Sequence, residues 1–122
     1  MGVKLIIPGR LPGLNDMIDA ARGNKYEAAR QKKENTELVM WYAKKAKLPK
    51  MKRVNVSVVW YEPNEKRDPD NVEAGIKFLL DGLVSAGVLA NDGRKQIGTI
   101  KHDVLVDKDK PRIEIEIEEV AV

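Results

Sequence analysis

Two aspartates separated by one proline are the residues of this 122-residue sequence best suited to chemistry. Pro69 fixes its own φ and disfavours helical backbone at Asp68. In an extended segment, the side chains of Asp68 and Asp70 point to the same side, with their Cα atoms about 6.5 Å apart. Two carboxylates placed in this way can bind one or two small cations. The chain has no cysteine, so any metal must be held mainly by oxygen.

Magnesium is the cation that such a pair suits best. Mg²⁺ takes hard oxygen ligands, keeps several waters and commonly binds one or two carboxylates together with phosphate oxygens of a substrate. A third carboxylate, Asp92, lies in the turn Asn91-Asp92-Gly93. The helix expected from about Asn71 to Ala86 carries the chain away for about 24 Å. Asp92 therefore reaches the pair only if the segment after this helix folds back.

The same residues also have ordinary structural explanations. Asp70 and Asn71 stand before an apolar helix, where Asp and Asn are common N-caps, and an Asp-Pro pair often opens a turn. Lys77 is spaced four residues from both Glu73 and Asp81, which is typical of an exposed ladder of ion pairs. The functional alternative for Lys77 is electrostatic stabilisation of a phosphate in the transition state.

Positive charge is concentrated in one part of the chain. Residues 22–53 hold eleven Lys and Arg against three Glu, whereas residues 107–122 carry a net negative charge. Such a basic field attracts a polyanion such as DNA, although an ordinary solvated, lysine-rich helix explains it as well. The basic side chains that we expect to contact DNA are Arg10, Arg30, Lys32, Lys33, Lys66 and Arg67.

Hydropathy patterning predicts a single α+β domain over residues 1–122, with a mixed sheet of about four strands and two helices packed on it. Alternation of apolar and polar residues indicates strands, and long stretches without Gly or Pro indicate helices. A long loop is expected between Gly13 and Tyr26. The predicted strands are 3–8, 54–60, 97–106 and 112–120, the predicted helices are 26–47 and 71–86, and the order is β-α-β-α-β-β.

Composition excludes several classes of protein. The chain is 43% hydrophobic and 34% charged, as expected of a globular protein with a heavily solvated surface. The first apolar run, Leu5 to Ile7, is too short for a signal peptide, and no run approaches membrane-spanning length, so we expect a cytoplasmic protein without a membrane partner. Motifs for organic cofactors are absent. His102 is more simply interpreted as a structural or solvated histidine than as a general base.

A set of short motifs resembles the RusA family of Holliday-junction resolvases. In that family, an R-D-x-D-N segment, a helix with a lysine and a D-a-L motif, and an a-G-x-x-x-D-D ending follow one another. The close match covers about Lys66 to Ile97, and a weaker match lies near the proline-rich start of the chain. The matching residues are Arg67-Asp68-Pro69-Asp70-Asn71, Lys77, Asp81-Gly82-Leu83, Ala86-Gly87-Val88-Leu89 and Asn91-Asp92.

The resemblance implies roles for individual residues. Asp68, Asp70 and Asp92 would be catalytic ligands of Mg²⁺, with Mn²⁺ as a substitute, and Lys77 would be the catalytic lysine. Two positions depart from the family pattern. Ala74 stands where the pattern has its lysine, so Lys77 fits only with an insertion of three residues. Asn91 replaces the first aspartate of the ending.

The function expected from this resemblance is Mg²⁺-dependent resolution of four-way DNA junctions by paired symmetric nicks, in recombination and repair. Two nicks in opposed strands require two active sites, so the resemblance also implies a homodimer. One alternative is a branched-DNA-binding module without catalysis, in which the inserted helical turn misplaces Lys77. A second alternative is a nuclease with a broader preference for forks and flaps.

Overall fold

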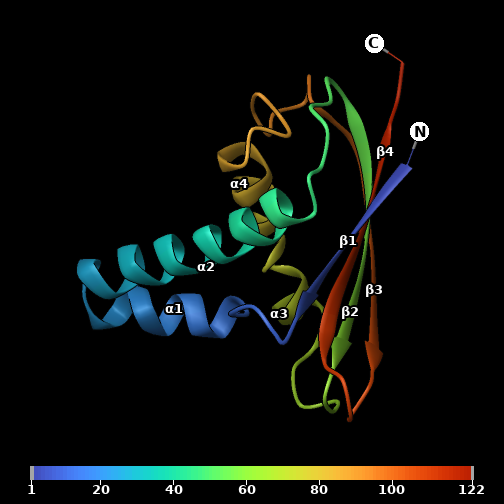
Figure 1. Ribbon diagram of the computed structural model, residues 1–122. Helices are drawn as coiled ribbons and strands as arrows, with labels where there is room; N and C mark the ends of the chain where they lie inside the picture. The colour runs from blue at the N-terminus through green and yellow to red at the C-terminus, as the bar shows by residue number, and fades with distance from the viewer. Residues whose placement is uncertain (1, 122) are drawn as a thin grey trace.

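The computed structural model describes residues 2–121, and its centre is one four-stranded mixed sheet (Figure 1). The strands occur in the order β1-β4-β2-β3. β4 pairs antiparallel with both β1 and β2, while β3 pairs parallel with β2. The predicted α+β class and mixed sheet are therefore confirmed. The strands are β1 (Gly2–Pro8), β2 (Val54–Glu62), β3 (Ile97–Val106) and β4 (Arg112–Glu119).

The helices lie on one face of the sheet, and α1 and α2 form a hairpin that extends away from it (Figure 1). The predicted loop between Gly13 and Tyr26 is wrong, because most of it is helix α1. The Asp16 carboxylate accepts a hydrogen bond from the Gly13 backbone N–H at 2.8 Å, which satisfies a free donor at the start of this helix. The helices are α1 (Leu14–Gly23), α2 (Lys25–Lys45), α3 (Pro69–Glu73) and α4 (Ile76–Ser85).

The single helix predicted over residues 71–86 is divided into α3 and α4. At the junction, the backbone makes tighter i→i−3 hydrogen bonds, from Gly75 to Val72 and from Phe78 to Gly75. Gly75 also packs against Trp60, since a Cβ atom there would lie 3.1 Å from two ring carbons. The approach of the tryptophan ring and the low helix propensity of glycine explain the break.

The core lies between the helices and the inward face of the sheet. Val54, Val56, Val58 and Trp60 alternate inward on β2, as predicted, and each is at most 2% exposed. Ile113, Ile115 and Ile117 do the same on β4. The second half of α2 contributes Val39 and Ala43 to this core, but its Trp41 is 54% exposed. This end of α2 is therefore buried along one face of the helix only.

Helices α2 and α4 cross closely at Gly82. A Cβ atom at Gly82 would lie 2.4 and 2.5 Å from two side-chain atoms of Val39. We expect Gly82→Ala to lower the free energy of unfolding by about 1–3 kcal/mol through overpacking, which corresponds to a Tm lower by about 4–12 °C for a chain of this size. Calorimetry would check this, with Ser85→Ala on the exposed side of α4 as the control. An unchanged Tm for Gly82→Ala would contradict the close crossing.

Candidate active site

Asp68 and Asp70 lie at the start of α3, where the chain leaves the end of β2. Asp68 is extended, with φ −66° and ψ 153°, but Pro69 already begins the helix and Asp70 lies in its first turn. The predicted extended conformation is therefore wrong for Asp70. The reason is local: proline is favoured at the first position of a helix, and acidic side chains are favoured in the first turn.

The carboxylate of Asp68 does not serve as a helix cap. Its backbone oxygen accepts the first helical hydrogen bond, from Val72 N–H at 3.1 Å, while its side chain makes no capping bond. Asp70 Oδ1 accepts a hydrogen bond from the Asn71 N–H at 3.0 Å. Both aspartates are exposed to solvent. The N-cap position is therefore held by Asp68, and the expectation that Asp70 or Asn71 caps the helix is wrong, because the helix already begins at Pro69. The Asp68 carboxylate stays accessible to a ligand.

Lys77 joins the first turn of α4 to the loop that carries Asp92. Its Nζ lies 3.2 Å from Asp81 Oδ1 and 3.6 Å from Asp92 Oδ2. The segment after α4 therefore folds back, which spacing along the sequence could not decide. Of the predicted ladder, the Lys77–Asp81 pair is present. Hydrogen bonding to Asp81 raises the pKa of Lys77, with a smaller contribution from Asp92, so the lysine is protonated at neutral pH.

The acidic side chains do not converge on one point. Within residues 2–121, no group of three or more Asp, Glu or His side chains is arranged to hold a metal ion. Asp92 instead lies beside Lys77, and Asp68 and Asp70 stand at the start of α3. The donor set is nevertheless compatible with Mg²⁺, since this ion needs only one or two carboxylates when phosphate oxygens of the substrate and water complete its coordination.

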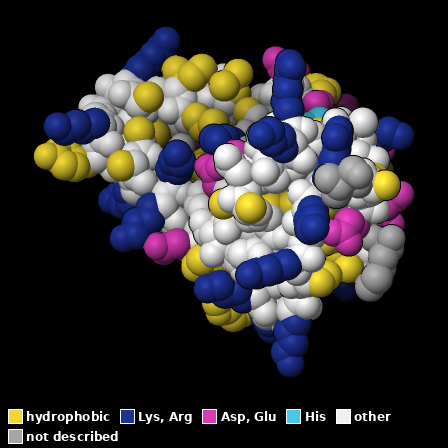
Figure 2. All heavy atoms as spheres, turned by 90° about the horizontal axis from the view of Figure 1, so that it is seen from above, with side chains coloured by type: hydrophobic (Ala, Val, Ile, Leu, Met, Phe, Trp, Pro, Cys, Tyr) yellow, Lys and Arg dark blue, Asp and Glu magenta, His cyan; other side chains and the backbone are white. Residues whose placement is uncertain are grey.

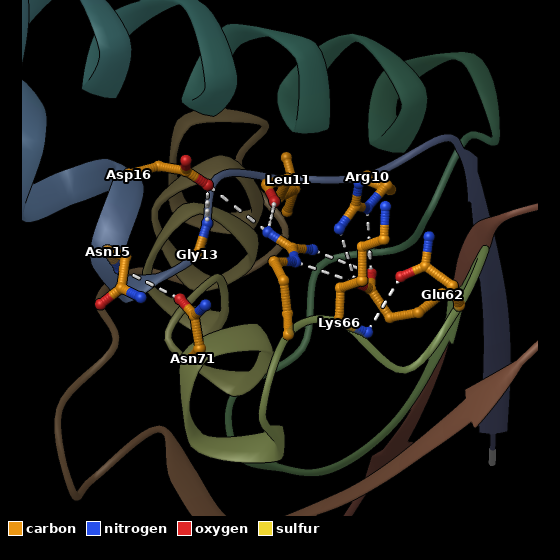
Figure 3. A network of polar contacts seen from close by, with 10 residues as sticks. Arg10, Leu11, Gly13, Asn15, Asp16, Glu62, Lys66 and Asn71 are labelled. Atoms are coloured by element: carbon orange, nitrogen blue, oxygen red, sulfur yellow. Dashed lines mark hydrogen bonds and ion pairs between the residues drawn. The ribbon is translucent and has the colours of Figure 1, made fainter.

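A buried ion-pair network lies beside these residues (Figure 3). Glu62, at the end of β2, is only 4% exposed. Arg67 donates to both oxygens of Glu62 from Nε and Nη2, each at 2.8 Å. Arg10 donates to Glu62 Oε1 from Nη2, also at 2.8 Å. Two arginines from distant parts of the chain therefore share one buried carboxylate.

Glu62 was not identified from the sequence, although a signal existed. The inward alternation of β2 that ends with Trp60 places its next inward position at Glu62. Burial acts to raise the pKa of Glu62, but hydrogen bonds from Arg67 and Arg10 outweigh it and lower the pKa below its ordinary value. The carboxylate is thus ionised at neutral pH. A buried carboxylate that is bonded to two arginines holds the side chains around it in fixed positions.

The basic side chains predicted to contact DNA differ in accessibility. The side chain of Arg67 is 15% exposed and is engaged inside the protein, whereas that of Arg10 is 39% exposed. Arg30, Lys32, Lys33 and Lys66 are exposed. Figure 2 shows Lys and Arg side chains spread over the face it displays, and a group of hydrophobic side chains on the part that extends to the left. Arg67 and Arg10 are thus both engaged with Glu62, although part of the Arg10 side chain is at the surface, and the other four predicted side chains are exposed.

His102 has a structural contact within the sheet. Its Nδ1 accepts a hydrogen bond from Trp60 Nε1 at 3.0 Å, between the neighbouring strands β2 and β3. This contact agrees with the structural interpretation of the histidine.

Among residues 2–121, no helix has the length and apolar character needed to cross a membrane.

Comparison with known proteins identifies the family. The family model described as endodeoxyribonuclease RusA matches residues 12–118, which run from the loop before α1 into β4. A search of curated proteins found no match to the chain. The matched region contains Asp68, Asp70, Lys77 and Asp92. The chain therefore belongs to the RusA family of endodeoxyribonucleases, hydrolases that cleave phosphodiester bonds of DNA.

Proposed function

We propose that this protein is a Mg²⁺-dependent resolvase that cuts four-way DNA junctions by paired symmetric nicks, acting in recombination and repair. The observation that carries the proposal is the family match over nearly the whole chain, including the exposed Asp68 and Asp70. The return of Asp92 to Lys77 supports it, because it brings two motif residues 15 positions apart within ion-pair distance. The whole chain would form one catalytic domain in the cytoplasm.

In this proposal, Asp68, Asp70 and Asp92 would hold the ion together with phosphate oxygens of the bound DNA, because the three carboxylates do not converge on one point without substrate. Mg²⁺, or Mn²⁺ in its place, would polarise a phosphate oxygen and make the attacking water easier to deprotonate. Lys77 would neutralise the negative charge that develops on the phosphate, since its pKa is raised by Asp81. Asp81 also keeps the lysine next to Asp92. The exposed basic side chains would bind the remaining phosphates of the junction.

Junction resolution requires two active sites that act on opposed strands. We therefore propose that the protein works as a homodimer, with one site from each copy. The basic half of α2 lies on the hairpin that extends from the sheet, where it is free to contact DNA (Figure 1). Arg30, Lys32 and Lys33 belong to this half.

A cleavage assay on defined DNA tests the function. The purified protein is incubated with a synthetic four-way junction, a fork, a flap and a linear duplex of matched sequence, with Mg²⁺, with Mn²⁺ and with EDTA. Symmetric nicks in the junction alone, dependent on the metal, support resolution. Equal cleavage of forks and flaps would favour the broader nuclease. Tight junction binding without cleavage under every condition would favour the binding module.

The role of the basic hairpin has its own test. Replacing Lys32 and Lys33 with Gln should reduce the slope of log Kd for the junction against log salt by about one to two, because each phosphate contact releases about one counterion. Fluorescence anisotropy between 50 and 300 mM salt measures this slope. Lys108 and Lys110, exposed in the β3–β4 turn, provide the matched double substitution. An equal change in both variants would mean that α2 has no particular contact with DNA.

A further inference from the structure

The buried carboxylate of Glu62 lies next to the candidate catalytic segment, but no motif includes it. We infer that Glu62 is a positioning residue that orients Asp68 and Asp70 through Arg67. The inference rests on the proposed catalytic role of these aspartates. Glu62 itself is 4% exposed and fully engaged with two arginines, so it does not contact DNA or metal directly.

The first step of the argument is the set of contacts made by Arg67, the residue immediately before Asp68. Its guanidinium donates hydrogen bonds to both oxygens of Glu62, each at 2.8 Å. Its Nη1 donates to the backbone oxygen of Leu11 at 3.1 Å and lies 3.5 Å from Asp16 Oδ2. A planar guanidinium bonded in three directions has little freedom to rotate. The backbone that leads into Asp68 is therefore fixed to both β2 and the loop before α1.

The second step is the contact on the other side of the aspartates. The side chain of Asn71, immediately after Asp70, accepts a hydrogen bond from the Asn15 backbone N–H at 3.0 Å (Figure 3). Gly13 permits this approach, because a Cβ atom there would lie 2.4 Å from Asn71 Oδ1 and 2.9 Å from Asn71 O. Asp68 and Asp70 are thus bracketed by Arg67 and Asn71, both bonded to the segment 11–16.

Glu62 is the anchor of this arrangement. Arg67 is attached to the sheet through the Glu62 carboxylate, and Arg10 attaches the start of the loop to the same carboxylate. Without the negative charge, two guanidinium groups would face each other across a site with little solvent, and Arg67 would lose its fixed orientation. Asp68 and Asp70 would then keep their carboxylates but lose their fixed positions relative to each other. A metal site with few protein ligands depends on such fixed positions.

The main experiment compares Glu62→Gln and Arg67→Lys with Glu114→Gln. Glu114 is a close control, since Lys4 and Arg112 both pair with it at 2.7 Å on the neighbouring strand β4. For each variant, kcat and KM are measured on the synthetic junction at several Mg²⁺ concentrations, and junction affinity is measured in EDTA. Hydrogen exchange of segments 11–16 and 66–73 is followed by mass spectrometry.

For Glu62→Gln and Arg67→Lys, we expect kcat to fall about 10- to 100-fold, as when groups that orient metal ligands are removed. The half-saturating Mg²⁺ concentration should rise, junction affinity in EDTA should stay within twofold, and exchange of both segments should accelerate. Because both residues act through one contact, the double variant should lose little more than either single variant. Glu114→Gln should keep the kcat and the exchange of these segments.

Several results would overturn the inference. Unchanged kcat and exchange in Glu62→Gln would do so, as would multiplicative losses in the double variant or a loss of junction affinity at constant kcat. If Glu62→Gln does not fold, Arg67→Lys carries the same test, because it keeps the charge and loses only the forked geometry. If the unaltered protein fails to cut any junction, the proposed function falls. The exchange measurement still decides whether Glu62 fixes the segment that contains Asp68 and Asp70.

Discussion

Asp70→Asn is expected to abolish junction cleavage while leaving junction binding intact or tighter. The substitution removes a proposed metal ligand and one negative charge from a position close to phosphate. Removing a group that only supports a metal ligand costs up to about 100-fold in activity. Asp70 is proposed as a ligand itself, so cleavage should fall by more than this. Single-turnover cleavage in Mg²⁺ and anisotropy in EDTA measure the two quantities separately. Because Asp70 is exposed, the variant should keep the fold and the Tm.

The matched control for this prediction is Asp109→Asn. Asp107 and Asp109 repeat the D-x-D spacing in the β3–β4 turn, where the Asp107 carboxylate accepts hydrogen bonds from the N–H groups of Asp109 and Lys110. This second pair is a turn-forming pair, so Asp109→Asn should cleave at the normal rate. Preserved cleavage in Asp70→Asn, with the same metal requirement, would remove Asp70 from the active site.

Glu62→Gln is expected to have the largest effect on stability. The substitution leaves Arg67, whose side chain is 15% exposed, without the closer of its two charged partners, since only Asp16 at 3.5 Å remains. Removal of one partner of a buried ion pair costs about 3–5 kcal/mol, which is a large part of the 5–15 kcal/mol that is typical for a domain. Urea unfolding at pH 7, followed by circular dichroism, would measure the loss. A change below 1 kcal/mol would mean that water or another group compensates the arginine.

The stability difference should also depend on pH. The pKa of Glu62 is lower in the folded protein than its ordinary value of 4.5 because the arginine hydrogen bonds outweigh the effect of burial. A carboxylate with a lowered pKa contributes stability above its unfolded pKa, and this contribution is lost as the pH falls through the folded pKa. The deficit of Glu62→Gln should therefore be largest near neutrality and shrink below pH 4.5.

Urea unfolding at a series of pH values from 7 to 3 checks this dependence. Glu116→Gln, on the exposed face of β4, serves as the control for the general effect of removing a carboxylate. If the stability deficit of Glu62→Gln is the same at pH 7 and pH 3, then the charge of Glu62 contributes nothing to the folded state. Any remaining effect of the substitution would then be steric.

The strands could be predicted well from the sequence, and the helices only in part. Alternation over 54–60 and 112–120 fixes which face of each strand is buried, since a shift by one residue would expose the whole apolar set. α1 was missed because the Pro-Gly sequence before it suggested a continuing loop. Apolar residues do recur at helical spacing there, at Leu14, Met17, Ile18 and Ala21, so the sequence contained a helix signal that the turn residues outweighed.

The candidate site could also be predicted only in part from the sequence. Residue types alone singled out Asp68 and Asp70, but their conformation was wrong because Pro69 is equally suited to an extended segment and to the first position of a helix. The proximity of Asp92 to Lys77 depends on how the chain folds after α4, which is a tertiary property. The buried position of Glu62 could have been read from the alternation of β2, but its pairing with Arg10 joins residues 52 positions apart and could not be inferred locally.

The position of β4 in the sheet has a consequence for synthesis of the protein. β4 is the last of the four strands to leave the ribosome, yet it lies between β1 and β2 and is hydrogen-bonded to both. Until β4 is made, β1 has no partner strand, and nothing joins β1 to β2. A nascent chain that already contains Asp68, Asp70, Lys77 and Asp92 therefore still lacks the complete sheet on which their segments pack. The complete sheet can therefore form only once translation has delivered this last strand.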